Sequence, residues 1–170
     1  MKHAVLVADP PWPFNDRLPG KKRGAAKHYS TLAMDRIREF PLPDLADDAV
    51  LFLWRVASMQ EEALSVIRAW GFTPKTEMVW IKKTARWKRW FGMGRIVRAE
   101  HETVLIATRG RPTVRTRVVR STFEAKAGRH SAKPEEFYAI VEQLYAGPYV
   151  ELFARRQRPG WTCEGDEVAA

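Results

Sequence analysis

The chain has 170 residues, a length that suits one domain with a sizeable core. A hydrophobic content of 45% and seven tryptophans favour a folded globule over a disordered chain. No apolar run approaches the ~20 residues of a membrane-spanning helix, and the first residues do not form a signal peptide. The single cysteine, Cys163, excludes an internal disulfide and a multi-cysteine zinc site, and no histidine cluster suggests another metal. We therefore expect one cytoplasmic domain over residues 1–170, without a metal and without a membrane partner.

The net charge of +9 suggests a polyanionic partner. Much of this charge lies in a segment without an acidic residue, which contains Lys82, Lys83, Arg86, Lys88, Arg89, Arg95 and Arg98. The aromatic residues Trp87, Trp90 and Phe91 are interspersed with these cations. Phosphate contact combined with base stacking requires this mixture, which favours a nucleic-acid-binding segment. The alternative is a solvated loop whose aromatic rings pack under the domain.

The first predicted element is a short buried strand over residues 4–8. It ends at Asp9, because Pro10 and Pro11 follow and cannot donate backbone hydrogen bonds. The two prolines also restrict the residue that precedes each of them. The sequence therefore predicts a stiff turn that holds one carboxylate at the carboxyl end of a strand, where open α/β sheets bind ligands.

This turn suits a nucleobase whose exocyclic amine must react. Asp9 can accept one N–H bond of the amine, and a carbonyl of the proline turn can accept the other. Trp12 or Phe14 can stack on the ring of the base. The alternative is a strand followed by a proline-rich turn with an N-capping aspartate.

The rest of the chain alternates strands and helices, with loops near residues 15–28 and 82–99 that we expect to be mobile. We expect strands over residues 49–54, 76–81 and 103–108, an edge strand over 113–119 and a last strand over 149–153. We expect a first helix over residues 34–40. A second helix should begin at a capping box of Ser58 and Glu61 and stop at Gly71. A third should run from Pro134 to about Tyr145. We interpret the segment Gly92-Met93-Gly94 as a flexible hinge rather than a cofactor loop. The alternation predicts an α/β fold, with a mostly parallel sheet and helices on both faces.

The tetrapeptide Asp9-Pro10-Pro11-Trp12 resembles the catalytic motif of the MT-A family of N6-adenine methyltransferases, to which the catalytic subunit of the eukaryotic mRNA adenosine methylase belongs. The resemblance continues in the family's order through His28-Tyr29-Ser30-Thr31-Leu32, Leu51-Phe52-Leu53-Trp54, Gly71-Phe72, Val79-Trp80-Ile81-Lys82, Gly92-Met93-Gly94, His101-Glu102, Arg109-Gly110, His130-Ser131-Ala132-Lys133-Pro134-Glu135, Glu151-Leu152-Phe153-Ala154-Arg155, Gly160-Trp161 and Gly165-Asp166-Glu167. It implies a single Rossmann-like methyltransferase domain with the permuted motif order of β-type amino methyltransferases. In that order the catalytic motif comes first and the cofactor-side strand last.

The resemblance also implies S-adenosylmethionine as cofactor and a set of site residues. The catalytic residues are Asp9, Pro10, Pro11 and Trp12. The cofactor-binding residues are Ala8, Asp9, Lys133, Glu151, Phe153, Arg155, Asp166 and Glu167. The substrate-binding residues are Trp12, Phe14, Tyr29, Lys82, Arg86, Trp87 and Arg98.

Within the cofactor set, the resemblance places Lys133 near the methionine carboxylate and Arg155 near the ribose hydroxyls. Phe153 would form a wall of the pocket, and the pair at positions 166 and 167 would lie near ribose and adenine. The chain departs from the family pattern at two places. Asp166 stands where an asparagine is common, and Gln157-Arg158 replaces a pair of the His-Asn type.

The function that these features predict is methyl transfer to the exocyclic N6 of adenine in a nucleic acid, with DNA favoured over RNA. The closest alternative is an RNA N6-adenosine methyltransferase. A catalytically silent nucleic-acid-binding scaffold of the same fold also fits, and a generic basic DNA-binding module is a third hypothesis. A homo-oligomer or a partner subunit is compatible with all of these hypotheses.

Overall fold

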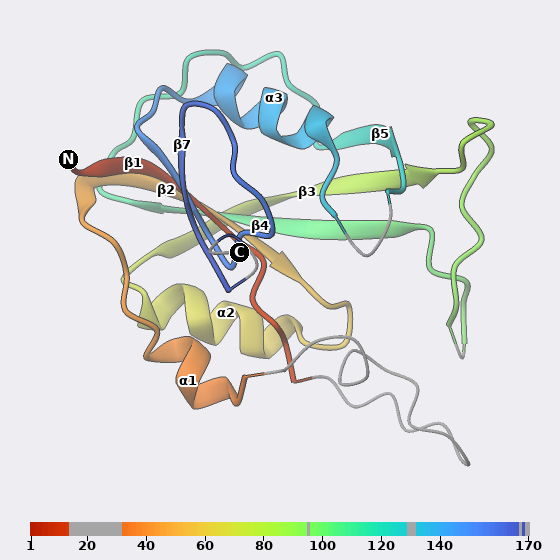
Figure 1. Cartoon of the computed structure of the whole chain (residues 1–170), viewed down its shortest axis with the longest axis horizontal. Helices are drawn as coiled ribbons and strands as arrows, with labels where there is room; N and C mark the ends of the chain where they lie inside the picture. The colour runs from red at the N-terminus through yellow and green to blue at the C-terminus, as the bar shows by residue number, and fades with distance from the viewer. Residues whose placement is uncertain (14–31, 95, 129–131, 167, 169–170) are drawn as a thin grey trace.

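The computed structural model describes residues 1–13, 32–94, 96–128, 132–166 and 168. In these residues seven strands form one sheet in the order β5-β3-β4-β2-β1-β6-β7 (Figure 1). The strands are β1 (His3–Ala8), β2 (Leu45–Arg55), β3 (Thr73–Lys83), β4 (His101–Arg109), β5 (Thr122–Lys126), β6 (Tyr149–Leu152) and β7 (Trp161–Glu164). The helices are α1 (Met34–Arg38), α2 (Gln60–Ala69) and α3 (Glu135–Leu144).

Strand direction determines where functional groups meet. β1 is parallel to β2 and β6, β6 is parallel to β7, and β3 is parallel to β5. β4 runs antiparallel to both of its neighbours, β2 and β3. All the described strands except β4 therefore end at the same edge of the sheet, which we call the carboxyl edge. This arrangement confirms the expected α/β fold with a mostly parallel sheet.

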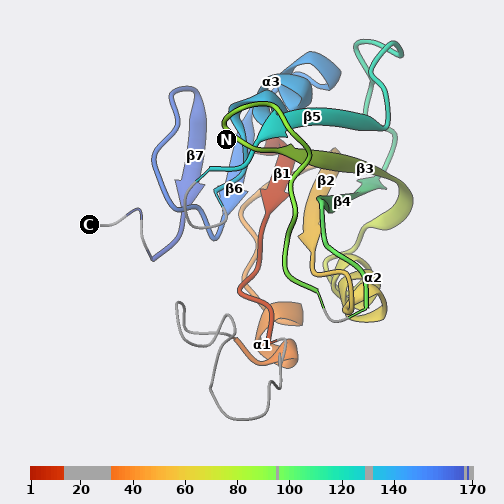
Figure 2. The same ribbon diagram turned by 90° about the vertical axis from the view of Figure 1, so that its right-hand side faces the viewer.

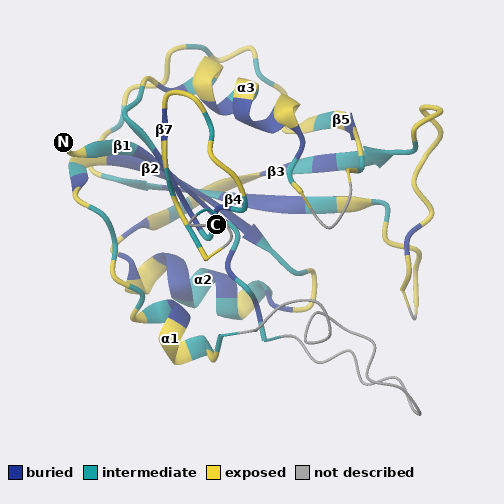
Figure 3. Cartoon of the chain, in the orientation of Figure 1, coloured by how far each residue is buried: buried dark blue, intermediate teal, exposed yellow. Residues whose placement is uncertain are grey.

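The helices cover the two faces of the sheet, α1 and α2 on one side and α3 on the other (Figure 2). Side chains alternate between the two faces along each strand. In β1, Leu6 and Ala8 pack toward α1 and α2, whereas Val5 and Val7 pack toward α3. The central strands are buried on both faces (Figure 3), which explains their continuous apolar sequences.

The helices largely match the sequence prediction. The apolar residues Phe137, Ile140, Val141 and Leu144, which recur at helical spacing in α3, all pack in one core cluster. Gly71 ends α2 with a positive φ of 79°, as expected of a C-terminal glycine. The predicted capping box is wrong, because Met59 is the N-cap residue of α2 and no side chain caps the helix. None of the described helices is long and apolar enough to cross a bilayer.

The outer strands differ from the prediction. Residues 113–119 form no strand, because this segment docks on the carboxyl end of α3 through Arg115. The Arg115 backbone N–H donates to the Leu144 carbonyl at 2.8 Å, and its guanidinium donates to the Glu142 carbonyl at 3.1 Å. The strand at this border of the sheet is β5, and β7 follows the strand that was expected to be the last. The predicted loop over residues 15–28 lies outside the described residues.

The predicted second loop includes residues 84–99, which follow β3 and which we call the arm. Its described residues, 84–94 and 96–99, extend beyond the sheet between β3 and β4 (Figure 1, light green). Gly92 donates its N–H to the Ala99 carbonyl at 3.0 Å, so the two limbs of the arm pair with each other. A side chain at Gly92 would place its Cβ 2.1 Å from the Ala99 oxygen. One at Gly94 would lie 2.0 Å from the Val97 oxygen. The glycines therefore permit a close backbone approach, and their role as a hinge stays a prediction.

Candidate active site

The site is built around the turn that follows β1. The Trp12 backbone N–H donates to the Pro10 carbonyl at 2.8 Å, which closes a three-residue turn. The Leu32 N–H donates to the Pro11 carbonyl at 3.0 Å and fixes the turn to the segment before α1. Together with the fixed φ of the two prolines, these bonds hold Asp9 at the carboxyl edge, as the sequence predicts.

Trp12 is a buried member of this turn, with only 3% of its surface exposed. Its indole N–H donates to the carbonyl of Trp54 at 3.0 Å, near the end of β2. The ring packs in the core on the α1 and α2 side of the sheet. In this structure Trp12 thus links the proline turn to the neighbouring strand, and its stacking on a base stays a prediction.

Four side chains of alternating charge form a chain that starts at Asp9. The Lys133 ammonium donates to Asp9 Oδ2 at 2.7 Å and lies 3.1 Å from Glu102 Oε2. The other Glu102 oxygen pairs with Lys82. Lys133 comes just before α3, Glu102 lies in β4 and Lys82 in β3. Four segments at the carboxyl edge, the turn after β1 among them, therefore supply this charge chain, which we define as Asp9, Lys133, Glu102 and Lys82.

The charge chain is largely shielded from water. The Lys133 side chain is 7% exposed, and its ammonium lies 4.9 Å from the centre of the Trp54 ring. Burial opposes the charge of Lys133, yet Asp9 and Glu102 outweigh this effect and hold its pKa above the ordinary value. Burial likewise opposes the charge of Glu102, but Lys133 and Lys82 hold the pKa of this carboxyl below its ordinary value. Lys133 and Glu102 are thus both charged at neutral pH.

Sequence reasoning did not single out Glu102 as a site residue. Glu102 lies in β4 opposite Trp80 of β3, and β2 borders β4 on its other side. This position brings its carboxylate between the two lysines. No local motif marks such a residue, because its role depends on the antiparallel pairing of β3 with β4. The only signal available was its place in the His101-Glu102 segment of the resemblance.

The end of β6 forms the neighbouring part of the site. Glu151 is 8% exposed and accepts a hydrogen bond from the Tyr138 hydroxyl at 2.7 Å. Burial raises the pKa of Glu151 above its ordinary value, although the Tyr138 bond and the nearby Arg158 act in the opposite direction. Phe153, the residue after β6, has a φ of +60°, and its ring centre lies 4.5 Å from that of Phe40. Such strain in a non-glycine residue is typical of functional sites.

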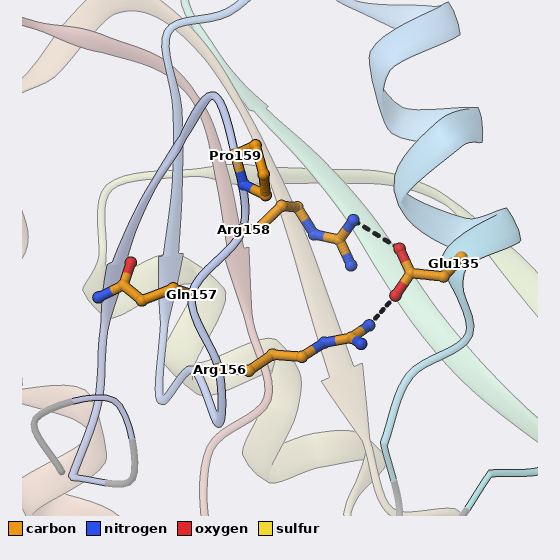
Figure 4. A pocket seen from close by; sticks show the side chains of 5 residues that line it. All are labelled: Glu135, Arg156, Gln157, Arg158 and Pro159. Carbon is orange, nitrogen blue, oxygen red and sulfur yellow. Dashed lines mark hydrogen bonds and ion pairs between the residues drawn. The ribbon is translucent and has the colours of Figure 1, made fainter.

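A shallow pocket lies between the start of α3 and the loop that connects β6 to β7 (Figure 4). The Glu135 carboxylate pairs there with the guanidinium groups of Arg156 and Arg158, the latter at 2.6 Å. Arg158 also lies 3.5 Å above the Tyr138 ring. Its Nε atom is buried without a hydrogen-bond partner among the described residues. The Gln157-Arg158 departure from the family pattern therefore places a cation against α3.

The strand ends of β6 and β7 approach each other closely. The Ala154 N–H donates to the Glu164 carbonyl at 3.0 Å. A Cβ at Gly165 would lie 2.2 Å from the Ala154 oxygen, so glycine is required there. Asp166 follows as an exposed residue, and Arg155 is half-buried. The remaining predicted cofactor residue of this region, Glu167, lies outside the described residues.

The predicted substrate residues fall into two groups. Lys82 is 19% exposed and belongs to the charge chain. Arg86, Trp87 and Arg98 lie on the arm and are exposed. Phe14 and Tyr29 lie outside the described residues.

Comparison with known proteins gives one consistent result. The family model described as MT-A70 matches residues 3–167. The chain is 30% identical over 179 residues to an N(6)-adenosine-methyltransferase MT-A70-like protein of Drosophila melanogaster, which covers 98% of this chain and 27% of the relative. It is 30% identical over 187 residues to the human N(6)-adenosine-methyltransferase catalytic subunit METTL3, with 98% of this chain and 28% of the relative covered.

A bacterial relative matches over a larger part of its own length. The chain is 30% identical over 191 residues to the type II methyltransferase M.MunI of a Mycoplasma species, with 98% of this chain and 78% of the relative covered. The chain thus spans little more than a quarter of the eukaryotic relatives but most of the bacterial one.

Proposed function

Because the chain belongs to the MT-A70 family, we propose that it transfers a methyl group from S-adenosylmethionine to the exocyclic N6 of adenine in DNA. The observation that carries this proposal is the Asp9 carboxylate, held on a rigid turn at the carboxyl edge and paired with the buried ammonium of Lys133. An acceptor for an amine and a cation for an anionic ligand therefore lie side by side.

The residues at this edge fit S-adenosylmethionine, which supplies an activated methyl group when bound. Lys133 provides an ammonium for a carboxylate, and the strained Phe153 provides an apolar ring. Arg158 keeps a buried donor, Nε, without a partner among the described residues. We assign Ala8, Glu151, Arg155 and Asp166 to the same site on the basis of the resemblance.

Asp9 orients the reacting amine. Lys133 occupies Oδ2, which leaves Oδ1 to accept an N–H bond of the adenine amine. Accepting this bond aims the nitrogen lone pair away from the carboxylate, so that the gain comes from orientation. Asp9 does not need to remove a proton before the attack, because the amine loses its proton readily once it is alkylated.

The choice of DNA over RNA rests on the relatives. The bacterial type II methyltransferase is matched over most of its length, whereas the adenosine methyltransferases are matched over about a quarter. The names of these adenosine methyltransferases make RNA the second candidate substrate.

The test is transfer of labelled methyl from S-adenosylmethionine to single-stranded DNA, duplex DNA and RNA of matched sequence, with the product nucleosides identified. We expect N6-methyladenine in DNA, and a loss of at least ~100-fold in the Asp9→Ala variant. The matched Asp9→Asn variant keeps the shape of the side chain and removes its charge. Circular dichroism and the melting temperature show whether each variant is folded.

Two results contradict the proposal. Transfer by Asp9→Ala at the wild-type rate removes the assigned role of Asp9. Absence of both transfer and cofactor binding, also after a cell extract is added to supply a partner subunit, favours the catalytically silent scaffold.

A further inference from the structure

The arm of residues 84–99 leaves the sheet at the edge that carries Asp9. β3 runs parallel to β1 in the sheet, because β4 between β2 and β3 is antiparallel to both. The arm therefore starts at the carboxyl edge, where β3 ends and β4 begins (Figure 1). Its base carries two members of the charge chain, Lys82 and Glu102, and these connect through Lys133 to Asp9.

The arm presents cations and aromatic rings to solvent. It contains five arginines and lysines and no acidic residue: Arg86, Lys88, Arg89, Arg95 and Arg98. Trp87 is 53% exposed and Phe91 is 76% exposed. Each ring has a cation beside it, because Lys126 lies 5.6 Å from the centre of the Trp87 ring and Arg98 lies 5.0 Å from that of Phe91. Each pair joins a flat apolar surface to a group that binds phosphate.

Trp87 keeps this exposure at a conformational cost. Its φ of +58° lies in the left-handed region, which a bulky residue rarely adopts and which glycine adopts freely. Two backbone hydrogen bonds close the turn. The Trp87 N–H donates to the Thr84 carbonyl at 2.9 Å, and the Thr84 N–H donates to the Lys88 carbonyl at 2.9 Å. A strained residue that is exposed contributes little to the core, and strain of this kind is typical of ligand-binding segments.

We propose that the arm binds an unpaired nucleic-acid strand, with Trp87 and Phe91 as stacking surfaces for bases and Arg86 and Arg98 as phosphate contacts. This inference rests on the proposed function, since the strand it holds is the methyl acceptor. Stacking needs bases with a free face, which an unpaired strand has and an intact duplex lacks. A second copy of the chain fits less well, because two arms with five cations each repel one another.

The aliphatic residues at the end of the arm provide the contrast for the test. Met93, Ile96 and Val97 are 80%, 97% and 75% exposed, and such side chains are typical of a protein interface. Their substitution separates strand binding from self-association. Trp87→Gly is the central variant, because it removes the ring and relieves the backbone strain at the same time.

The experiment measures fluorescence anisotropy of labelled 15-mers as single-stranded DNA, as the same DNA in duplex form and as RNA. We expect the wild type to bind the single strands at least ~10-fold more tightly than the duplex. Trp87→Gly should weaken single-strand binding by about 5- to 150-fold without lowering the melting temperature, and Trp87→Phe should restore most of the affinity. Arg98→Ala should lower the slope of log affinity against log salt by about 0.7. The control, Val118→Ala, changes an exposed valine outside the arm and should change neither quantity.

Equal binding of duplex and single strand by the wild type, or no loss with Trp87→Gly, overturns the inference. Light scattering that shows a wild-type dimer, dissociated by Ile96→Ser with strand affinity unchanged in Trp87→Gly, assigns the arm to a subunit interface instead. Methyl transfer measured on the same variants separates this result from the proposed function. Methyl transfer that the arm variants do not affect supports the proposed function and contradicts the role of the arm. Strand binding without any methyl transfer supports the role of the arm and contradicts the proposed function.

Discussion

The charge chain and the arm place the same kinds of side chain at nearly the same spacing. Lys133 lies 4.9 Å from the centre of the Trp54 ring, and Arg98 lies 5.0 Å from that of Phe91. The Lys133 side chain is 7% exposed, whereas Arg98 is an exposed residue. In the first case the cation needs two carboxylates to compensate its lost hydration, and in the second case water solvates it. Burial rather than contact distance therefore decides whether a cation is compensated by carboxylates of the protein or by water.

Lys82 shows how this difference reorganises the basic segment. It lies 5.0 Å from the centre of the Trp80 ring and pairs with Glu102, while its side chain is 19% exposed. By charge and sequence position it belongs with the arginines of the arm. By burial and partner it belongs with Asp9 and Lys133. The comparison therefore predicts different consequences for the same substitution at the three cations.

The largest expected effect is that of Lys133→Met. Its removal leaves the carboxylates of Asp9 and Glu102 in a largely buried site without the cation between them. We expect the free energy of unfolding to fall by about 3–5 kcal/mol, measured by urea denaturation. The matched control, Arg98→Met, should change it by less than about 0.5 kcal/mol. Similar losses of stability in both variants would contradict the distinction between the buried cation Lys133 and the exposed cation Arg98.

The second effect concerns pH and Glu102. Its pKa in the folded protein lies below the ordinary value of 4.5 that the unfolded chain approaches. The unfolded chain therefore binds a proton more readily, and the stabilisation by this group is complete above that ordinary value. It is lost as the pH falls through the lower folded value. In Glu102→Gln the melting temperature should therefore fall less steeply as the pH is lowered from 7 to 3, measured by thermal unfolding. An unchanged dependence on pH would contradict the assigned charge state.

A smaller effect than that of Lys133→Met is expected for Lys82→Met. Lys133 still compensates Glu102 in this variant, and the half-buried carboxylate reaches some water. We expect a loss of ~1 kcal/mol in the free energy of unfolding, between the values for Lys133 and Arg98. A salt titration of strand binding sharpens the result. If Lys82→Met leaves the slope of log affinity against log salt unchanged, Lys82 acts with the charge chain. If the slope becomes lower, Lys82 acts with the arm.

Local signals predicted a large part of the fold and the centre of the site. The buried strand β1 is fixed by a run of apolar residues, and two prolines fix the turn that holds Asp9. α3 was predicted from its apolar spacing and from Pro134, which is its N-cap residue. The resemblance selected Lys133, and the structure brings it within 2.7 Å of Asp9 over 124 positions of sequence.

The remainder depends on contacts that are distant in sequence. Residues 113–119 have the alternation of a strand, but Arg115 binds the carbonyl end of α3 and β5 takes the place beside β3. From the sequence, Trp12 is an aromatic residue beside the proline turn that can stack on a base, and in the structure the carbonyl of Trp54 holds its indole in the core. Glu102 acquires its role only when β3 and β4 pair. Sequence pattern does not encode which of several possible partners a side chain reaches.

The pairing of β3 with β4 has a consequence for how such proteins diversify. The backbone N–H of Lys82 donates to the Glu100 carbonyl at 2.9 Å, so the arm leaves and re-enters the sheet at adjacent points. A two-residue turn is long enough to connect the two strands at that point, so the arm could be replaced by another segment without moving β3 or β4. If the arm binds the strand as proposed, replacing it with a different segment should change which polymer is bound while the seven described strands stay in place. Under the proposed functions, strand binding by the arm and methyl transfer at the Asp9 turn are separable units of one small domain.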